Sequence, residues 1–147
     1  MSTSSRFAVA VHVLTLMAGA GDEAVKSDYV ATSVNTNPVV IRRILCALSR
    51  AQLVTSQKGS AGGYRLARKP RQITLLEVYR AVEDGNVFLL HRQRPNRHCQ
   101  IGKNIEMVLG GVLEQVDSAV ERVLAKITVA NVWQSINSCG SGKRKAG

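Results

Sequence analysis

The chain has 147 residues with 45% hydrophobic and 4% aromatic content, enough for one domain with a core or for a small domain plus an assembly arm. Its 20 Lys and Arg against 10 Asp and Glu give a net charge of +10, which favours an anionic partner, nucleic acid before a membrane surface. We expect a cytoplasmic protein with no membrane association, because no signal peptide and no bilayer-length apolar run is predicted and three cysteines do not suit a disulfide framework.

The first predicted helix begins after the serines at 4–5 and runs to about Ala18, where Gly19 and Gly21 end it. Apolar residues occur nearly all round this helix. We therefore expect it to be buried, against the rest of the domain and against a partner. His12 within it is expected to be a packed core group rather than a ligand.

Two short helices joined by a tight turn follow, a pattern typical of a helix-turn-helix. Ser27 is predicted to cap the first, over 28–34, and Asn37 to cap the second, over Pro38–Arg50. The inward side of the second helix is predicted to hold Ile41, Ile44, Leu45 and Leu48, with Cys46 packed beside them. Its other faces are predicted to carry Arg42, Arg43 and Arg50.

A glycine-rich hairpin is predicted next, with strands over Leu53–Gln57 and Tyr64–Arg68. Thr74 and Glu77 have the spacing of a capping box, which predicts a helix to about Glu83. Residues 29–76 contain eight Lys or Arg and no Asp or Glu. A basic surface on a helix and a hairpin suits a polyanion with grooves, so the stretch indicates duplex DNA.

Residues 86–100 look like a linker before a long helix from about Ile101 to about Lys126. Apolar residues recur along that helix at alternating spacings of four and three, at Ile105, Leu109, Val112, Val116, Ala119 and Val123. This seam favours pairing with a second chain over packing on its own domain. The tail from Ser138 is expected to be disordered.

These elements predict a mainly α fold with a small β-hairpin, a winged helix-turn-helix plus a long dimerisation helix. The predicted parts are a winged helix-turn-helix DNA-binding domain over 1–85, a linker over 86–100, a dimerisation helix region over 101–137, and a disordered basic tail over 138–147.

Three segments together resemble one family: Asn37–Leu45, the strand and wing from Leu53 to Arg68, and Ile73–Val82. They are similar to the Rrf-type winged-helix transcription regulators, the group of IscR, NsrR and CymR, and most similar to its YwnA-like branch without a cluster. The resemblance implies a homodimer whose long helices cross and whose two heads read a palindromic operator. It implies DNA contacts at Asn37, Val39, Val40, Arg42, Arg43, Lys58, Gly59, Ser60 and Ala61, and we expect Ser27 to contact DNA as well.

The chain departs from the family at two places. IscR-like members have Glu and Gln where Arg42 and Arg43 stand, so an operator sequence does not transfer. Cluster-binding members carry three cysteines in the linker, whereas this linker has Cys99 alone, so we expect no iron–sulfur cluster and no other cofactor. His91, His98 and Cys99 form a conceivable metal set, but their spacing is poor and we predict no metal site.

Cys99 is the candidate for a redox response, because the neighbouring Arg97 and Lys103 and a helix start stabilise a thiolate; the alternative is an inert cysteine. The interpretation is a homodimeric, sequence-specific DNA-binding regulator, a repressor, that responds to thiol oxidation. Its alternative is a regulator controlled by a small ligand or metal bound between head and dimer helix. A further alternative is a module for RNA or protein contacts. No catalytic set or phosphate loop is evident, so no enzyme is expected.

Overall fold

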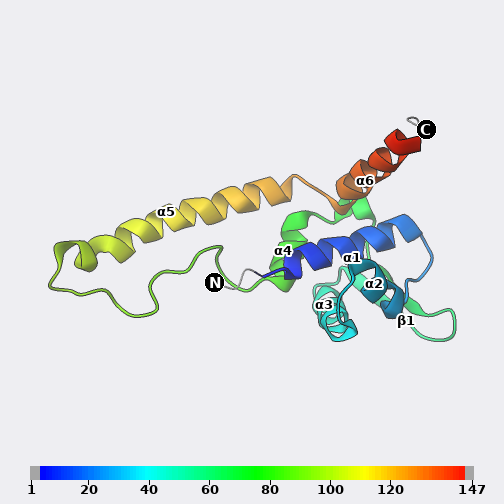
Figure 1. The fold of residues 1–147 in the computed structure, drawn as a ribbon, viewed down its shortest axis with the longest axis horizontal. Coiled ribbons are helices and arrows are strands. Elements are labelled where there is room, and N and C mark those ends of the chain that lie inside the picture. Colours follow the sequence, from blue (N-terminus) through cyan, green and yellow to red (C-terminus); the bar gives the residue numbers. More distant parts are fainter. Residues whose placement is uncertain (1–3, 145–147) are drawn as a thin grey trace. The chain divides into compact units, whose positions relative to one another are not determined.

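The structure, a computed structural model, describes residues 4–144. The chain divides into two units, which we describe separately: the head, formed by the chain up to Glu83 together with the chain from Ala125, and the arm, Asp84–Leu124 (Figure 1). The elements in chain order are α1 (Arg6–Ala20), α2 (Ser27–Val34), α3 (Pro38–Arg50), β1 (Val54–Gln57), β2 (Gly63–Leu66), the short 3-10 helix η1 (Pro70–Gln72), α4 (Leu75–Val82), α5 (Gln100–Ala125) and α6 (Val129–Arg144).

Helix α1 forms the centre of the head. It packs against α2, α3, α4 and α6, and Figure 1 shows it between α6 on one side and α2 and α3 on the other. Its residues Ala10, Val13, Leu14 and Met17 are buried, as the apolar sequence predicts. The helix continues two residues beyond the predicted end, to Ala20, and Gly21 with a φ of 64° terminates it.

The helix-turn-helix consists of α2 and α3. Asn35 adopts the left-handed conformation at the end of α2, with a φ of 60°, and its N–H returns to the carbonyl groups at that helix end. Asn37 then caps α3, because its Oδ1 accepts a hydrogen bond from the Val39 N–H at 2.9 Å. The four predicted inward residues Ile41, Ile44, Leu45 and Leu48 are all buried.

The predicted cap of α2 is wrong. Ser27 is the first helical residue, and Lys26 occupies the cap position with extended backbone and without a side-chain cap bond. The reason is non-local: Val25 exchanges two backbone hydrogen bonds with Tyr64 of β2, each 2.8 Å, and this bridge fixes where the extended segment ends.

The wing is an antiparallel hairpin in which Val54 pairs with Leu66 and Gln57 with Gly63. Gly63 has a φ of 149°, and a Cβ built on it would lie 2.6 Å from the Val25 carbonyl oxygen. A side chain there would strain the backbone and separate the hairpin from the segment before α2. The glycine therefore lets β2 pair with β1 and Val25 together.

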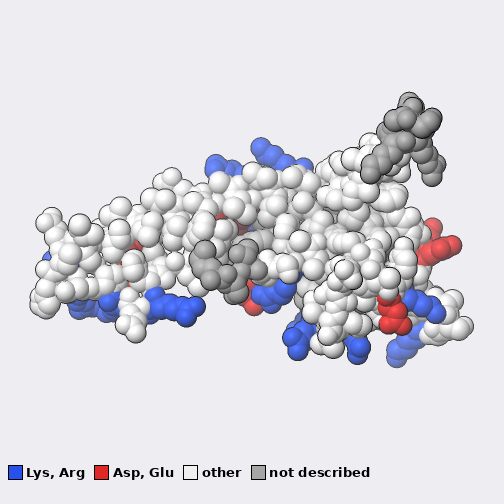
Figure 2. All heavy atoms as spheres, viewed as in Figure 1, with Lys and Arg blue, Asp and Glu red and all other residues white. Residues whose placement is uncertain are grey.

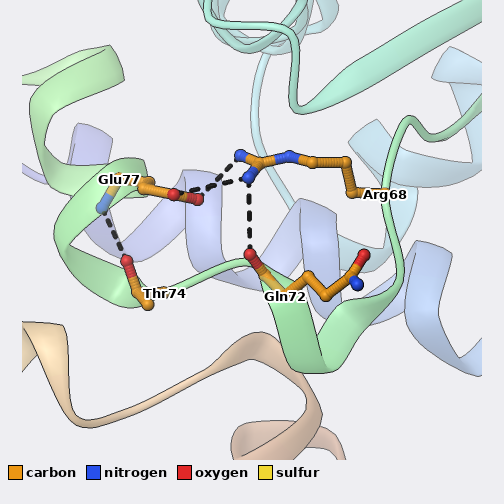
Figure 3. A network of polar contacts seen from close by, with 4 residues as sticks. All are labelled: Arg68, Gln72, Thr74 and Glu77. Atoms are coloured by element: carbon orange, nitrogen blue, oxygen red, sulfur yellow. Dashed lines mark hydrogen bonds and ion pairs between the residues drawn. The ribbon is translucent and has the colours of Figure 1, made fainter.

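A cap and an ion pair hold α4. Thr74 Oγ1 accepts from the Glu77 N–H at 3.2 Å, which is the predicted cap. The Glu77 carboxylate pairs with Arg68, at 2.7 Å between Oε2 and Nη2, and Arg68 also reaches the Gln72 carbonyl oxygen (Figure 3). This pair joins the end of the hairpin to the start of α4.

The chain after α5 returns to the head, and this differs from the predicted parts. Leu75 N–H donates to the Ile127 carbonyl at 2.8 Å and Val129 N–H to the Ile73 carbonyl at 2.9 Å. Thr128 and Asn131 then cap α6 reciprocally, at 2.8 and 3.1 Å. Residues from 129 to 137 therefore pack on α1 instead of extending the dimerisation helix.

The predicted disordered tail is also wrong over the part that the structure describes. Helix α6 continues through Ser138 to Arg144, because Val129, Val132 and Trp133 anchor its first turns and adding residues to an existing helix costs little. Residues 145–147 of the predicted tail lie outside the described residues.

In the arm, residues 84–99 form no helix or strand and precede α5. Val87 N–H donates to Asp117 Oδ1 at 3.0 Å, so the segment runs beside the helix. No residue of α5 is buried, and Ile101, Met107 and Val108 are 61–75% exposed.

The fold is mainly α with a two-stranded hairpin, and this prediction is confirmed. Within residues 4–144 no helix is long and apolar enough to cross a bilayer.

Candidate nucleic-acid interface

The outer face of α3 gathers exposed residues opposite its buried side. Val39 is 46% exposed, and Arg42, Arg43, Cys46 and Arg50 are exposed as well. Residues three and four apart share one face of a helix, so these five form a continuous row. We call Val39, Arg42, Arg43, Cys46 and Arg50 the α3 stripe.

The arginines of the α3 stripe carry uncompensated charge. Among the described residues, no carboxylate forms an ion pair with Arg42, Arg43 or Arg50. The guanidinium groups are therefore available to an external anion. An arginine can accept a phosphate or donate two hydrogen bonds to a guanine edge.

The hairpin tip is the second basic element. Lys58, Gly59, Ser60 and Ala61 are all exposed, and the turn closes through a 2.9 Å hydrogen bond from the Gly62 N–H to the Gly59 carbonyl. Figure 2 shows Lys and Arg side chains along the edge of the head on which α3 and the hairpin lie in Figure 1. A tip with small side chains lets the backbone approach a DNA groove closely.

Two arginines of the acid-free stretch have partners within the head. Arg68 is bound to Glu77, as Figure 3 shows, and Arg65 donates to the Asp22 carbonyl oxygen at 3.2 Å. These contacts shape the base of the hairpin. They leave the α3 stripe and Lys58 as the better candidates for phosphate contacts.

The structure brings most of the predicted site residues to α3 and the hairpin tip, with three qualifications. Asn37 uses its side-chain oxygen in the helix cap, so it has a structural role irrespective of DNA. Val40 is half-buried beside the outward row. Ser27 is half-buried in the first turn of α2, on a different helix from the α3 stripe.

The sequence-based prediction for Cys46 is wrong. The sequence predicts packing beside Leu45, but Cys46 is exposed. Adjacent residues on a helix are about 100° apart, so the neighbour of a buried residue need not be buried. The spacing of four from Arg42 and three from Arg43 was the signal that could have placed it on the α3 stripe.

Cys99 belongs to the arm and is also exposed and unpaired. Its carbonyl oxygen accepts from the Lys103 N–H at 2.8 Å, so it sits immediately before α5. This is the position predicted for it at a helix start.

Sequence comparison gives a family match. The Rrf2 family, described as "Iron-dependent Transcriptional regulator", matches residues 3–135. Over 133 residues the chain is 41% identical to YwnA of Bacillus subtilis (strain 168), which carries the name of an HTH-type transcriptional regulator; the match covers 90% of this chain and 98% of that protein.

Solved structures share the fold. A crystal structure described as that of a DNA-binding protein is 40% identical, with a TM-score of 0.70, and the match covers 87% of this chain and 98% of that one. IscR of T. potens is 25% identical with a TM-score of 0.71, over 92% and 88% of the two chains. CymR of B. subtilis, the global cysteine regulator, is 20% identical with a TM-score of 0.67 over 92% and 98%, and shows the likeness of fold alone.

The iron in the family description does not fit the donors that the structure describes. Among those residues, no group of three or more His, Cys, Asp or Glu side chains could hold a metal ion. Cys46, Cys99 and Cys139 are each unpaired and lie on three different elements or their ends.

Proposed function

Because this chain belongs to the Rrf2 family of transcriptional regulators, we propose that it is a homodimeric repressor that binds a palindromic operator in duplex DNA. The predicted resemblance to Rrf-type regulators is confirmed by the family match and by the identity with YwnA. The dimer, the operator symmetry and repression are parts of the proposal.

The observations that carry the DNA proposal are the unpaired charge of the α3 stripe and the exposed lysine of the hairpin tip, on the same edge of the head (Figures 1 and 2). Arg42, Arg43 and Arg50 have no carboxylate partner among the described residues, and Lys58 is exposed at the tip. In a winged helix-turn-helix the second helix enters the major groove, and phosphate contacts hold it in register. In this arrangement Arg42 and Arg43 face base edges or phosphates, while Lys58 to Ala61 follow the backbone or the minor groove.

Helix α5 supports the proposed dimer. Two residues of the predicted apolar seam are exposed, Val112 at 49% and Val123 at 58%. No residue of the helix is buried within the chain. Apolar side chains at heptad spacing gain free energy when a second helix covers them. A second copy of the chain supplies the same seam, and a two-fold pair matches a palindromic site.

Selection of bound duplexes from a random library tests the function. We expect an enriched palindrome whose half-site centres lie about one helical turn, or a multiple of it, apart. Sedimentation of the protein alone should give a dimer at micromolar concentration. Enrichment of a motif without two-fold symmetry would contradict the dimeric reading, and no enrichment at all would contradict sequence-specific binding.

The proposed signal is oxidation of Cys99. Peroxide converts a thiolate to a sulfenic acid and releases hydroxide, and a second thiol can then displace water to form a disulfide. The exposure of Cys99 and its place before α5 support this role. DNA affinity measured before and after mild peroxide should fall in the wild type and not in Cys99→Ser. An equal fall in DNA affinity in both proteins would show that Cys99 is not the site of the response.

The proposal assigns no catalytic role to the chain and places it in the cytoplasm, where duplex DNA and reduced thiols occur together. The three unpaired cysteines support that location. Turnover of a substrate at the DNA-binding face would contradict the proposal that the protein has no catalytic role.

A further inference from the structure

A cavity of about 870 Å³ opens on the head, and none of the residues expected to contact DNA is in its lining. Its walls come from α1, from the segment between α1 and α2, from the first turn of α2, and from α6. All of these belong to one unit. The volume lies within the range of about 300–1,000 Å³ that is typical of small-molecule sites. We call this cavity the α1–α6 pocket.

Close packing of Trp133 on α1 shapes the pocket. A Cβ added to Gly19 would lie 2.9 Å from Cζ3 of the indole, so the glycine leaves room for the ring to lie against the α1 backbone. Trp133 thereby forms part of the wall instead of filling the space between α1 and α6. Thr15, also in the wall, donates its hydroxyl to the Val11 carbonyl at 2.7 Å and offers little polarity to a ligand.

The lining is chemically selective. It is mainly aliphatic, from residues such as Val11, Leu16, Val132 and Ile136, with Tyr29 and Trp133 as aromatic members. The described lining contains one acid, Glu23, and one lysine, Lys26, so their charges offset each other. A multiply charged phosphate compound finds no cationic cluster there, whereas an uncharged aromatic ring gains from burial and stacking.

His12 supplies one polar anchor in this lining, because it is exposed and not the packed core group that the sequence predicts. Its Nε2 lies 3.0 Å from Ser33 Oγ on α2, which leaves Nδ1 without a hydrogen bond among the described residues. A neutral imidazole paired through one nitrogen can donate to, or accept from, one ligand group through the other. A hydroxyl or carbonyl group on the ligand satisfies that requirement without bringing a net charge.

The pocket is joined to both DNA-binding elements. Tyr29 and Lys26 lie at the start of α2, and the bond from His12 to Ser33 ties α1 to that helix. Val25 lines the pocket and exchanges two 2.8 Å hydrogen bonds with Tyr64 of the hairpin. A ligand that favours one arrangement of this segment over another shifts the population of α2 and wing positions accordingly.

We infer that the α1–α6 pocket is an effector site for a small uncharged aromatic molecule bearing one hydroxyl or carbonyl group. Ligand binding is inferred from the pocket alone. The effect of a bound ligand on operator affinity rests on the proposed function.

The uncharged dye N-phenyl-1-naphthylamine is the first probe, titrated into the full chain. Trp133 is the single tryptophan of the sequence and lines the pocket, so energy transfer from it reports a dye bound in its neighbourhood. We expect saturable binding at about one site per chain, with loss of Trp133 emission. Absence of saturable binding, or saturable binding without energy transfer, overturns the inference.

A pair of variants on α6 locates the dye. Val132→Phe fills the pocket from its wall and should weaken dye binding by roughly tenfold or more, a loss of about 1.4 kcal/mol. Gln134→Phe adds the same ring at an exposed position of the same helix outside the lining and should leave binding unchanged. Equal dye binding by both variants shows that the dye does not bind in the α1–α6 pocket. If Val132→Phe fails to fold, the wild-type titration still decides whether the dye binds near Trp133.

The polar anchor is tested with 2-naphthol against naphthalene, each displacing the dye. The wild type should prefer 2-naphthol by about threefold to tenfold, the worth of one hydrogen bond. His12→Phe should abolish the preference and Ser33→Ala, which keeps the imidazole, should preserve it. 2-Naphthyl phosphate should bind more weakly than 2-naphthol; stronger binding overturns the uncharged class.

Two further outcomes separate the inference from its rivals. If a second copy of the chain occupies the pocket in the assembled protein, dye binds only as dilution produces monomer, and that result overturns the inference. With duplexes from the selected library, dye saturation should change affinity by at least about threefold. If saturating dye leaves the DNA affinity unchanged, the pocket binds a ligand but does not regulate DNA binding. If the protein binds dye but no duplex, the proposed DNA-binding function is wrong and the ligand site is still supported.

Discussion

Replacing both Arg42 and Arg43 with alanine should remove the centre of the proposed DNA interface. Both side chains are exposed and neither has a carboxylate partner among the described residues, so their loss leaves no buried charge unpaired. If each arginine neutralises one phosphate, a dimer loses four contacts, and the slope of log affinity against log salt should fall by about 3.6. If either reads a base instead, its loss should cost on the order of 1–3 kcal/mol and relax specificity at that base pair.

Arg68→Ala is the matched control, since it removes one positive charge from the same basic stretch. Arg68 is already paired with Glu77, and both side chains are 39% exposed (Figure 3). An exposed ion pair contributes about 0–1 kcal/mol to stability, so the fold should tolerate its loss. Fluorescence anisotropy with a selected duplex, at four or more salt concentrations, gives the affinity and the slope for each protein.

Lysine at the same positions separates the two roles of Arg42 and Arg43. Arg42→Lys and Arg43→Lys keep the charge but lose the planar fork that pairs with guanine. A residue that contacts phosphate should then retain its salt slope, and a residue that reads a base should lose specificity. The reasoning fails if the double alanine variant binds as the wild type does, or if Arg68→Ala weakens binding as much as the double variant.

Three further predictions follow from α5, the α3 stripe and the wing. Val112→Asp should weaken dimer association by at least roughly 2 kcal/mol, because a carboxylate enters an apolar contact. The control Gln115→Asp places the same charge off the seam and should leave dimer association unchanged. Sedimentation equilibrium measures both variants, and a monomeric wild type would contradict the proposed dimer. Cys46, as the sole cysteine of a variant with the others changed to serine, should react with maleimide freely and be protected by operator DNA; equal reaction rates with and without DNA would remove it from the interface. Gly63→Ala should lower the free energy of unfolding by about 1–3 kcal/mol through strain and its approach to Val25, and a denaturant midpoint equal to that of the wild type would contradict this.

Sequence reasoning succeeded where the determining contacts lie within one helical turn. Asn37 and Pro38 set the start of α3, and Thr74 sets the start of α4, because a cap bonds to an N–H two or three residues ahead. The buried side of α3 follows from the spacing of its apolar residues in the same way. These signals are local, so a single sequence contains them in full.

The failures arise where distant segments meet. The start of α2 depends on the bridge between Val25 and Tyr64, which lie 39 residues apart in the chain. The return of the chain to the head depends on the bridge between Thr74 and Thr128, and it converts part of the expected dimerisation region into α6. The α1–α6 pocket likewise draws residues from positions 8 to 136, and no local pattern marks them as neighbours.

The placement of charge is a case in which both kinds of information are needed. The eight positive residues between 29 and 76 predict the part of the chain that binds a polyanion, but their count treats them as equivalent. The structure separates them: Arg68 is paired with an acid just beyond the stretch, and Arg65 is tied to a backbone carbonyl. A cation already satisfied within the fold gives up that contact when it moves to DNA, so it adds less affinity than a free one. The interface that we propose therefore centres on Arg42, Arg43 and Arg50, which have no carboxylate partner among the described residues, and net charge alone overstates its extent.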